Sequence, residues 1–275
     1  MPEVTFRDIQ KGLRELGLTP HSRVLVHTSL SAFGHVRGGA ETVVGALTSA
    51  CQLVMAPTFT YQCMIHPRVG PPNNGMAYGD HFSANAEAEM FQPNLPAHPD
   101  MGGVAETLRR LPGAARSSHP LLSFAAVGQG AELALAAQSL AEPLGPIAHL
   151  AEHEGDALLL GVGHSVNTSI HYAEYHAGRK QFIRWALTPR GVVECVAWPG
   201  DSAGFDAILP HVRDLIRSTQ IGQAHVQRLP LRDLLRVAEG LIRADPAVLL
   251  CQQPGCERCE AVRGSLSTAR APAAV

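Results

Sequence analysis

The sequence predicts an α/β fold, chiefly from the order of its first elements. Arg23–Val26 reads as a short strand, a helical pattern follows over Ala40–Ala50, and Gln52–Ala56 reads as the next strand. This strand–helix–strand order is typical of a parallel sheet. Farther along, Phe182–Leu187 and Val192–Trp198 flank the turn TPRG, so we expect an antiparallel hairpin there.

The remaining elements are predicted from apolar periodicity and from the residues that interrupt it. The first helix starts at Thr5 and ends at Gly17. Between residues 57 and 101 the periodicity is lost, and so long a loop in a compact domain is usually functional or mobile. Further helices are expected at Gly103–Leu111, Ala131–Leu140, Phe205–Ser218 and Leu231–Arg243, and further strands at Ser123–Val127, Ala157–Leu160 and Ala247–Cys251. We interpret residues 1–270 as a single domain and residues 271–275 as a disordered tail.

The composition is that of an ordinary globular protein. Of its 275 residues, 45% are hydrophobic and 17% are charged, and the net charge is −2. This balance argues against nucleic acid as the main partner, because nucleic acids favour a basic surface. No apolar run approaches the ~20 residues of a membrane span, and the start of the chain lacks a signal pattern. We therefore expect a cytoplasmic protein, monomeric or homodimeric, whose six cysteines are thiols or metal ligands.

The stretch Leu158–Glu174 is the most informative part of the chain. It reads as a buried strand, a glycine turn and the opening of a helix, with Asn167 or Thr168 as the N-cap. His171 and Glu174 are three residues apart and so share one face of that helix. Ligands of open α/β sheets bind where a strand ends and a helix begins. An imidazole beside a carboxylate can accept a proton there, although a hydrogen-bonded packing histidine explains the same pattern.

Three other polar segments are candidates for binding. Hydroxyls and small residues precede a helix in His27-Thr28-Ser29-Leu30-Ser31 and in Arg37-Gly38-Gly39, as an anion site requires, although a capped polar turn has the same composition. Arg116, with Ser117, His119 and Ser123 nearby, can bind phosphate or amide groups, unless this is simply a solvated loop. Carboxylates of the long loop would attract a polycation, or else be solvated independently: Asp80, Glu87, Glu89 and Asp100.

The C-terminal cysteines have the spacing of a metal knuckle. Cys251-x4-Cys256-x2-Cys259 supplies three ligands of a tetrahedral zinc site. Cys63 or His66 could fold back as the fourth ligand. A closed set of cysteine ligands would make this zinc structural, and free thiols are the alternative.

Taken together and in this order, five stretches resemble the aminoglycoside 3-N-acetyltransferase family, also called the antibiotic N-acetyltransferase family. They are VLVHTSLSAFG, VRGGAETVVGAL, MAPTFTY, MGGVAETLRRLPGAARSSHPLLSFAAVG and LLLGVGHSVNTSIHYAE. The resemblance implies an α/β/α sandwich with a mixed central sheet, distinct from the small acetyltransferase fold. It also implies transfer of acetyl from acetyl-coenzyme A to the 3-amino group of the 2-deoxystreptamine ring of an aminoglycoside.

The resemblance assigns roles to residues of this chain. The family's His-x-Ala-Glu falls on His171 and Glu174, which would be general base and its orienting carboxylate, with Thr168 bonding the thiol or the oxyanion. His119 is the competing base. Coenzyme A would contact residues 27–31, 37–39 and 116–123, and the antibiotic would contact Tyr61, Asp80, Glu87, Asn167 and Glu174.

Three other functions fit parts of the sequence. The acceptor could be a different amine, since the long loop carries no readable code for it. The 14 histidines with the acidic loop could form a hydrolytic metal site, although no HExxH pair is present. A zinc-bound interaction module is the third, and it would have no need of a site around His171.

Overall fold

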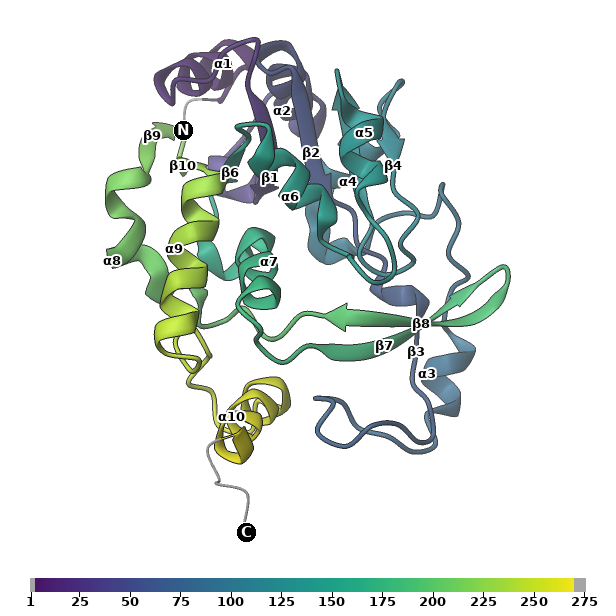
Figure 1. Ribbon diagram of the computed structural model, residues 1–275. Coiled ribbons are helices and arrows are strands. Elements are labelled where there is room, and N and C mark those ends of the chain that lie inside the picture. The colour runs from purple at the N-terminus through teal and green to yellow at the C-terminus, as the bar shows by residue number, and fades with distance from the viewer. Residues whose placement is uncertain (1–2, 270–275) are drawn as a thin grey trace.

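A mixed central sheet organises the molecule, seen in a computed structural model that describes residues 3–269 (Figure 1). Within these residues it has seven strands in the order β4-β5-β2-β1-β6-β10-β9. The inner strands β1 (Arg23–Thr28), β2 (Leu53–Pro57) and β6 (Asp156–Leu160) pair in parallel. The outer strands pair antiparallel: β4 (Ala115–Arg116), β5 (Phe124–Gly128), β9 (Arg217–Ile221) and β10 (Ala224–Pro230). The α/β prediction is confirmed.

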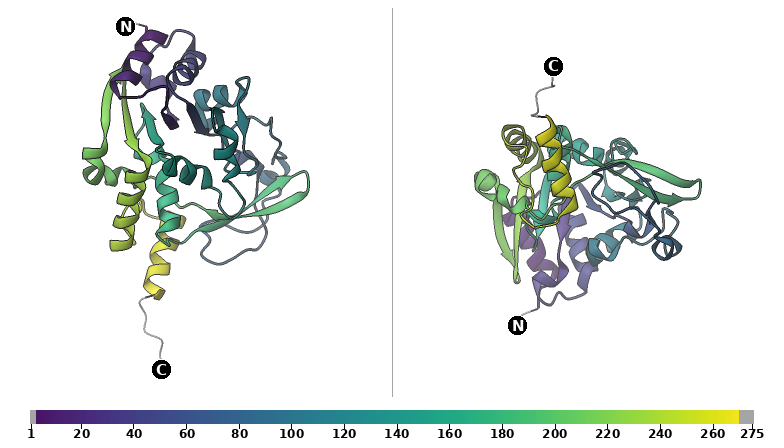
Figure 2. Two further views of the ribbon diagram at one scale, coloured as in Figure 1. Left: turned by 45° about the horizontal axis from the view of Figure 1, so that its top comes forward. Right: turned by 90° about the horizontal axis from the view of Figure 1, so that it is seen from below.

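Helices cover both faces of this sheet and so produce three layers (Figures 1 and 2). Alternation along β1 explains why: Val24 and Val26 point into one apolar core, and Leu25 points into the other. The first core includes side chains of α1 (Phe6–Glu15), α2 (Gly39–Ala50) and α4 (Gly102–Arg110). The second includes those of α5 (Ala131–Ala136), α6 (Gly145–Glu152), α7 (Thr168–His176) and α9 (Leu231–Ala244).

The predicted hairpin is present and lies outside the central sheet. Strands β7 (Phe182–Thr188) and β8 (Gly191–Trp198) pair antiparallel, and β3 (Met64–Ile65) adds a third strand. The hairpin projects to one side together with α3 (Phe82–Ala86), as Figure 1 shows. The long segment 57–101 therefore contains short elements that accompany this second sheet. No described helix is long and apolar enough to cross a membrane.

Two predicted elements are wrong. The helix predicted over Phe205–Ser218 is a series of short turns, with α8 (Leu209–Val212) among them, and Arg217–Ile221 is the edge strand β9. Pro210 lacks the N–H that a continuous helix needs. The strand predicted at Ala247–Cys251 is a loop, in which Leu249 has a φ of 64° that no strand adopts.

A helix that the sequence analysis missed, α10 (Glu257–Ala269), follows that loop. It lies at the end of the molecule opposite α1 (Figure 2). The predicted tail 271–275 lies outside the described residues.

Candidate active site

A cavity of about 910 Å3 opens at the carboxyl ends of the parallel strands. Its wall begins with His27 and Thr28 at the end of β1 and continues through Ser29–Ser31. The first turn of α7, which follows β6 after a short loop, adds Thr168 and His171. The strand ends of the parallel sheet thus bring residues 27–31, Thr168 and His171 around one space, as expected for an α/β fold.

Glu174 connects His171 to a buried arginine. Its Oε2 lies 2.6 Å from Nδ1 of His171, and its Oε1 accepts a hydrogen bond from Nη1 of Arg179 at 2.6 Å. The side chains of Glu174 and Arg179 are each 1% exposed, so the two opposite charges are removed from water together. His171, whose Nδ1 lies against Glu174, lines the cavity.

The start of α7 holds this arrangement in place. Asn167 is the N-cap, as predicted, and its Oδ1 accepts a hydrogen bond from the N–H of Ser169. At the other end, Gly178 with a φ of +81° turns the chain so that Arg179 returns to Glu174. The sequence analysis missed Arg179, which was not among the predicted site residues.

Thr168 is bound by a histidine from β1. Nε2 of His27 accepts a hydrogen bond from the backbone N–H of Thr168 at 3.1 Å and lies 3.0 Å from its hydroxyl oxygen. Burial, with the nearby His164 and His171, lowers the pKa of His27 to about 3, so this ring is neutral. Because Nε2 accepts, the ring proton is on Nδ1, and the Thr168 hydroxyl can rotate between Nε2 and a ligand in the cavity.

Only part of the predicted coenzyme A site lies at this cavity. Residues 27–31 line it, whereas Arg37, Gly38 and Gly39 do not. Arg37 is 71% exposed and donates to Glu3, and the two glycines form the start of α2. Residues 37–39 therefore form a hydrogen-bonded turn on the surface and not part of the cavity wall.

The predicted residues Arg116, Ser117 and Ser123 do not line the cavity, and the Arg116 side chain is half-buried and hydrogen-bonded within the protein. Arg116 donates to the carbonyl oxygens of Thr58, Pro93 and Leu95 and to the hydroxyl of Ser123. The hydroxyl of Ser117 accepts from the N–H of Phe124. These contacts tie the strands and the long loop together.

The His119 side chain, like that of Arg116, is hydrogen-bonded within the protein. Its Nδ1 accepts from the N–H groups of Leu121 and Leu122, at 3.2 and 2.9 Å. Burial lowers its pKa to about 4, and its side chain does not line the cavity. The geometry therefore favours His171 over His119 as the base.

We expect Arg116→Met to lower stability rather than affinity for a cofactor. The variant leaves three backbone carbonyls without their charged donor, a loss of at least about 2 kcal/mol of unfolding free energy. Thermal unfolding measures this loss, and Arg190→Met, on an exposed turn, is the control. A normal melting temperature combined with a raised KM for acetyl-coenzyme A would instead indicate that Arg116 binds the cofactor.

The predicted acceptor residues are divided in the same way. Tyr61 lines the cavity, whereas Asp80 and Glu87 do not. Of the other two carboxylates of the acidic loop, Asp100 lines the cavity and Glu89 does not. Asn167 is fully buried, and both carboxylate oxygens of Glu174 are used within the protein. Glu174 therefore fits the orienting role and not direct contact with an ammonium group.

Trp198 and Arg258 also line the cavity and were not predicted. Trp198 is the last residue of β8, and its ring centroid lies 5.8 Å from that of Tyr61. Arg258 belongs to α10. Trp198 carried a weak signal, as the aromatic end of a predicted strand. Arg258 carried none, because its helix was not predicted.

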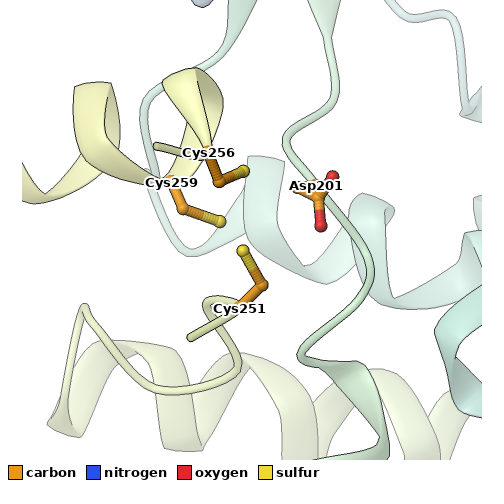
Figure 3. Close-up of side chains that lie close together, drawn as sticks. All are labelled: Asp201, Cys251, Cys256 and Cys259. Carbon is orange, nitrogen blue, oxygen red and sulfur yellow. The ribbon is translucent and has the colours of Figure 1, made fainter. Parts of the chain in front are cut away.

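The three C-terminal cysteines are brought together as predicted, but the fourth partner is different. Ligand atoms of Cys251, Cys256, Cys259 and Asp201 lie within 4.8 Å of one another (Figure 3). Cys63 is buried in the main core and His66 lies against His81, so neither completes this group. Among the described residues this is the one group of three or more such side chains, and it contains no histidine.

Comparison with known proteins identifies the family of this chain. The family model described as aminoglycoside 3-N-acetyltransferase matches residues 25–243. Aminoglycoside N(3)-acetyltransferase IX of Micromonospora chalcea is 35% identical over 190 residues, which are 66% of this chain and 66% of that protein. The alignment thus spans just under two thirds of this curated relative.

Solved structures match over almost the whole chain. The apoenzyme of aminoglycoside acetyltransferase AAC(3)-IVa superposes with a TM-score of 0.78 at 28% identity, covering 96% of this chain and 99% of that one. A histidine-to-alanine variant of the same enzyme, in complex with a gentamicin, gives 0.76 at 29% identity, with 96% and 98% covered. Together with the family match, these similarities confirm the predicted α/β/α architecture and the resemblance. The chain therefore belongs to the aminoglycoside 3-N-acetyltransferase family.

Proposed function

We propose that this protein transfers the acetyl group of acetyl-coenzyme A to the 3-amino group of the 2-deoxystreptamine ring of an aminoglycoside, and thereby confers resistance. The observation that carries the proposal is the chain of contacts from His171 through Glu174 to Arg179 on the wall of the cavity. Family membership and the gentamicin complex of a related enzyme support it. The donor places the reaction in the cytoplasm.

His171 is the proposed general base. The acceptor amine binds as an ammonium ion and must lose a proton before it can attack the thioester. Nε2 of His171 takes that proton, and Glu174, bonded to Nδ1, stabilises the imidazolium that forms. Arg179 compensates the buried negative charge of Glu174 and holds the carboxylate in position.

Thr168 is the proposed donor to the thioester. Its hydroxyl rotates from His27 toward the ligand and bonds the oxyanion or the sulfur as charge develops there. The C–N bond forms and the C–S bond breaks. Of the two protons that the ammonium nitrogen loses on becoming an amide, the first passes through His171 to the departing coenzyme A thiolate and the second goes to solvent. No covalent acetyl-enzyme is needed, because holding two substrates together supplies much of the rate.

We expect Thr168→Val to lower kcat by on the order of 10²-fold, because valine keeps the shape of threonine and loses the hydroxyl. Thr168→Ser keeps the hydroxyl and should keep most of the rate. Steady-state release of coenzyme A measures both variants. Equal rates in the valine and serine variants would remove Thr168 from the mechanism.

Few charged side chains line the cavity. Among the described residues that line it, Asp100 is the carboxylate and Arg258 is the guanidinium. Asp100 is therefore the proposed partner of an ammonium group, with Tyr61 and Trp198 as flat apolar walls. Ser29, Leu30 and Ser31 are the proposed contacts of coenzyme A.

An acetylation assay tests the whole proposal. The purified protein is incubated with acetyl-coenzyme A and a panel of deoxystreptamine antibiotics, with simple mono- and diamines as comparison acceptors. Mass spectrometry should find one acetyl group on the antibiotic, with coenzyme A release in equal amount. Acetylation of the comparison amines alone would replace the antibiotic as the acceptor, and no transfer to any amine would overturn the proposal.

A further inference from the structure

The cysteine cluster at the start of α10 is separate from the chemistry proposed above. Cys256 and Cys259 come from one end of that helix, Cys251 comes from the loop after α9, and Asp201 follows β8. In Figure 3 the three sulfur atoms and the carboxylate face one another across a small space. Segments far apart in the chain meet at this point.

We infer that Cys251, Cys256, Cys259 and Asp201 form a structural zinc site. Their ligand atoms all lie within 4.8 Å of one another. In a tetrahedral site with zinc–sulfur distances near 2.3 Å, sulfur atoms are roughly 3.8 Å apart. The side chains therefore need only small movements to close around an ion.

The chemistry of the four ligands selects the metal. Three thiolates and one carboxylate suit a borderline-soft cation that prefers four tetrahedral ligands, and Zn2+ fits that description. Four protein ligands leave no open position for a substrate or water. The ion would therefore stabilise the fold and take no part in acetyl transfer.

Two arginines surround this cluster and offset its charge. Three thiolates and a carboxylate around Zn2+ carry a net charge of −2. Arg258 donates to Oδ2 of Asp201 at 2.9 Å, and Arg263 donates to the carbonyl oxygen of Cys251. The remaining oxygen of Asp201 accepts from the N–H of Ala203 at 2.9 Å, so the carboxylate is oriented from two sides, as metal-binding carboxylates usually are.

The position of the site gives it a consequence for the cavity. In the sequence, Arg258 lies between the proposed ligands Cys256 and Cys259, and Gly200 and Ser202 flank the proposed ligand Asp201. Arg258, Gly200 and Ser202 line the cavity. Arg258 also donates to the carbonyl oxygen of Gly200 at 3.1 Å. A zinc ion would therefore lock one wall of the cavity by joining α10 to the loop after β8.

Metal analysis of the full chain, purified without chelator or added metal, tests this inference. We expect about one zinc ion per chain. Cys256→Ala should lose it, whereas Cys51→Ala, which removes a buried cysteine at the end of α2, should keep it. Asp201→Asn is the milder variant and should weaken zinc retention during dialysis while the protein stays folded.

Two further measurements keep the test decisive. Cobalt added to the reduced, metal-free protein should give the absorption of a tetrahedral thiolate site, and Cys256→Ala should abolish this absorption. Thiols counted in the denatured protein without reductant should reach all six. Absence of zinc with no cobalt spectrum, or a count of four that reveals a disulfide, would overturn the inference. None of these readouts depends on acetyl transfer.

Discussion

Replacing His171 with alanine should lower kcat by roughly 10²–10⁴-fold, the usual contribution of a positioned general base. The side chain removed is the one that faces the cavity while Glu174 holds its Nδ1. Affinity for acetyl-coenzyme A should change little, because the proposed cofactor contacts lie on the Ser29–Ser31 side of the cavity. Stopped-time assays of coenzyme A release, with calorimetric binding of acetyl-coenzyme A, measure the two effects separately.

The matched control is His176→Ala. His176 lies on the same helix but is exposed and outside the cavity, so kcat should remain near that of the unmodified protein. If the His171 variant turns over as fast as the control, a group other than His171 is the general base. A parallel loss of binding and turnover would assign His171 to substrate binding instead.

Glu174→Gln should affect both rate and stability. The substitution keeps the shape of the side chain but leaves Arg179 as a buried charge without its counter-ion, a loss of about 3–5 kcal/mol of unfolding free energy. It also removes the negative charge that stabilises the imidazolium of His171, so kcat should fall as well. Urea unfolding and steady-state kinetics at low temperature measure the two effects.

The double variant Glu174→Gln/Arg179→Met separates the two effects. Removing both charges should restore much of the stability, since no unpaired buried charge remains. It should not restore kcat, because His171 still lacks its carboxylate. The single variant Arg179→Met completes the comparison. A stability loss in the double variant equal to the sum of the losses in the two single variants would show that Glu174 and Arg179 are not coupled, contrary to the observed pairing.

The sequence predicts best what depends on neighbours along the chain. The N-cap at Asn167 and the shared face of His171 and Glu174 follow from the geometry of a single helix, and both are present. Arg179 is only five residues farther on, but it reaches Glu174 because of the turn at Gly178. Helical periodicity alone does not predict that return.

Contacts between distant segments were harder to predict. The sequence analysis named His27 and Thr168 as site residues, but it did not predict their direct contact across 141 positions. Arg116 was expected to bind the cofactor because an arginine beside serines has the composition of a phosphate site. Its carbonyl partners come from a loop without periodicity, so the sequence could not reveal that its donors were already used.

Misread elements account for the remaining errors. The helix predicted over Phe205–Ser218 runs into the first two residues of the edge strand β9, because Phe205, Ile208 and Val212 have helical spacing. The missing α10 hid Arg258, and with it the connection between the cysteines and the cavity. Asp201 stands alone in a loop, so no spacing rule marked it as a partner of the cysteines.

The separation of the two sheets has an evolutionary consequence. The proposed base and its carboxylate lie on α7, next to the parallel core, whereas Trp198 ends a hairpin strand of the smaller sheet. Insertions, deletions or exchanges in that hairpin can alter the pocket for the acceptor while proton transfer is preserved. Chimaeras that exchange β7 and β8 among relatives should therefore change the antibiotic spectrum faster than they erode turnover.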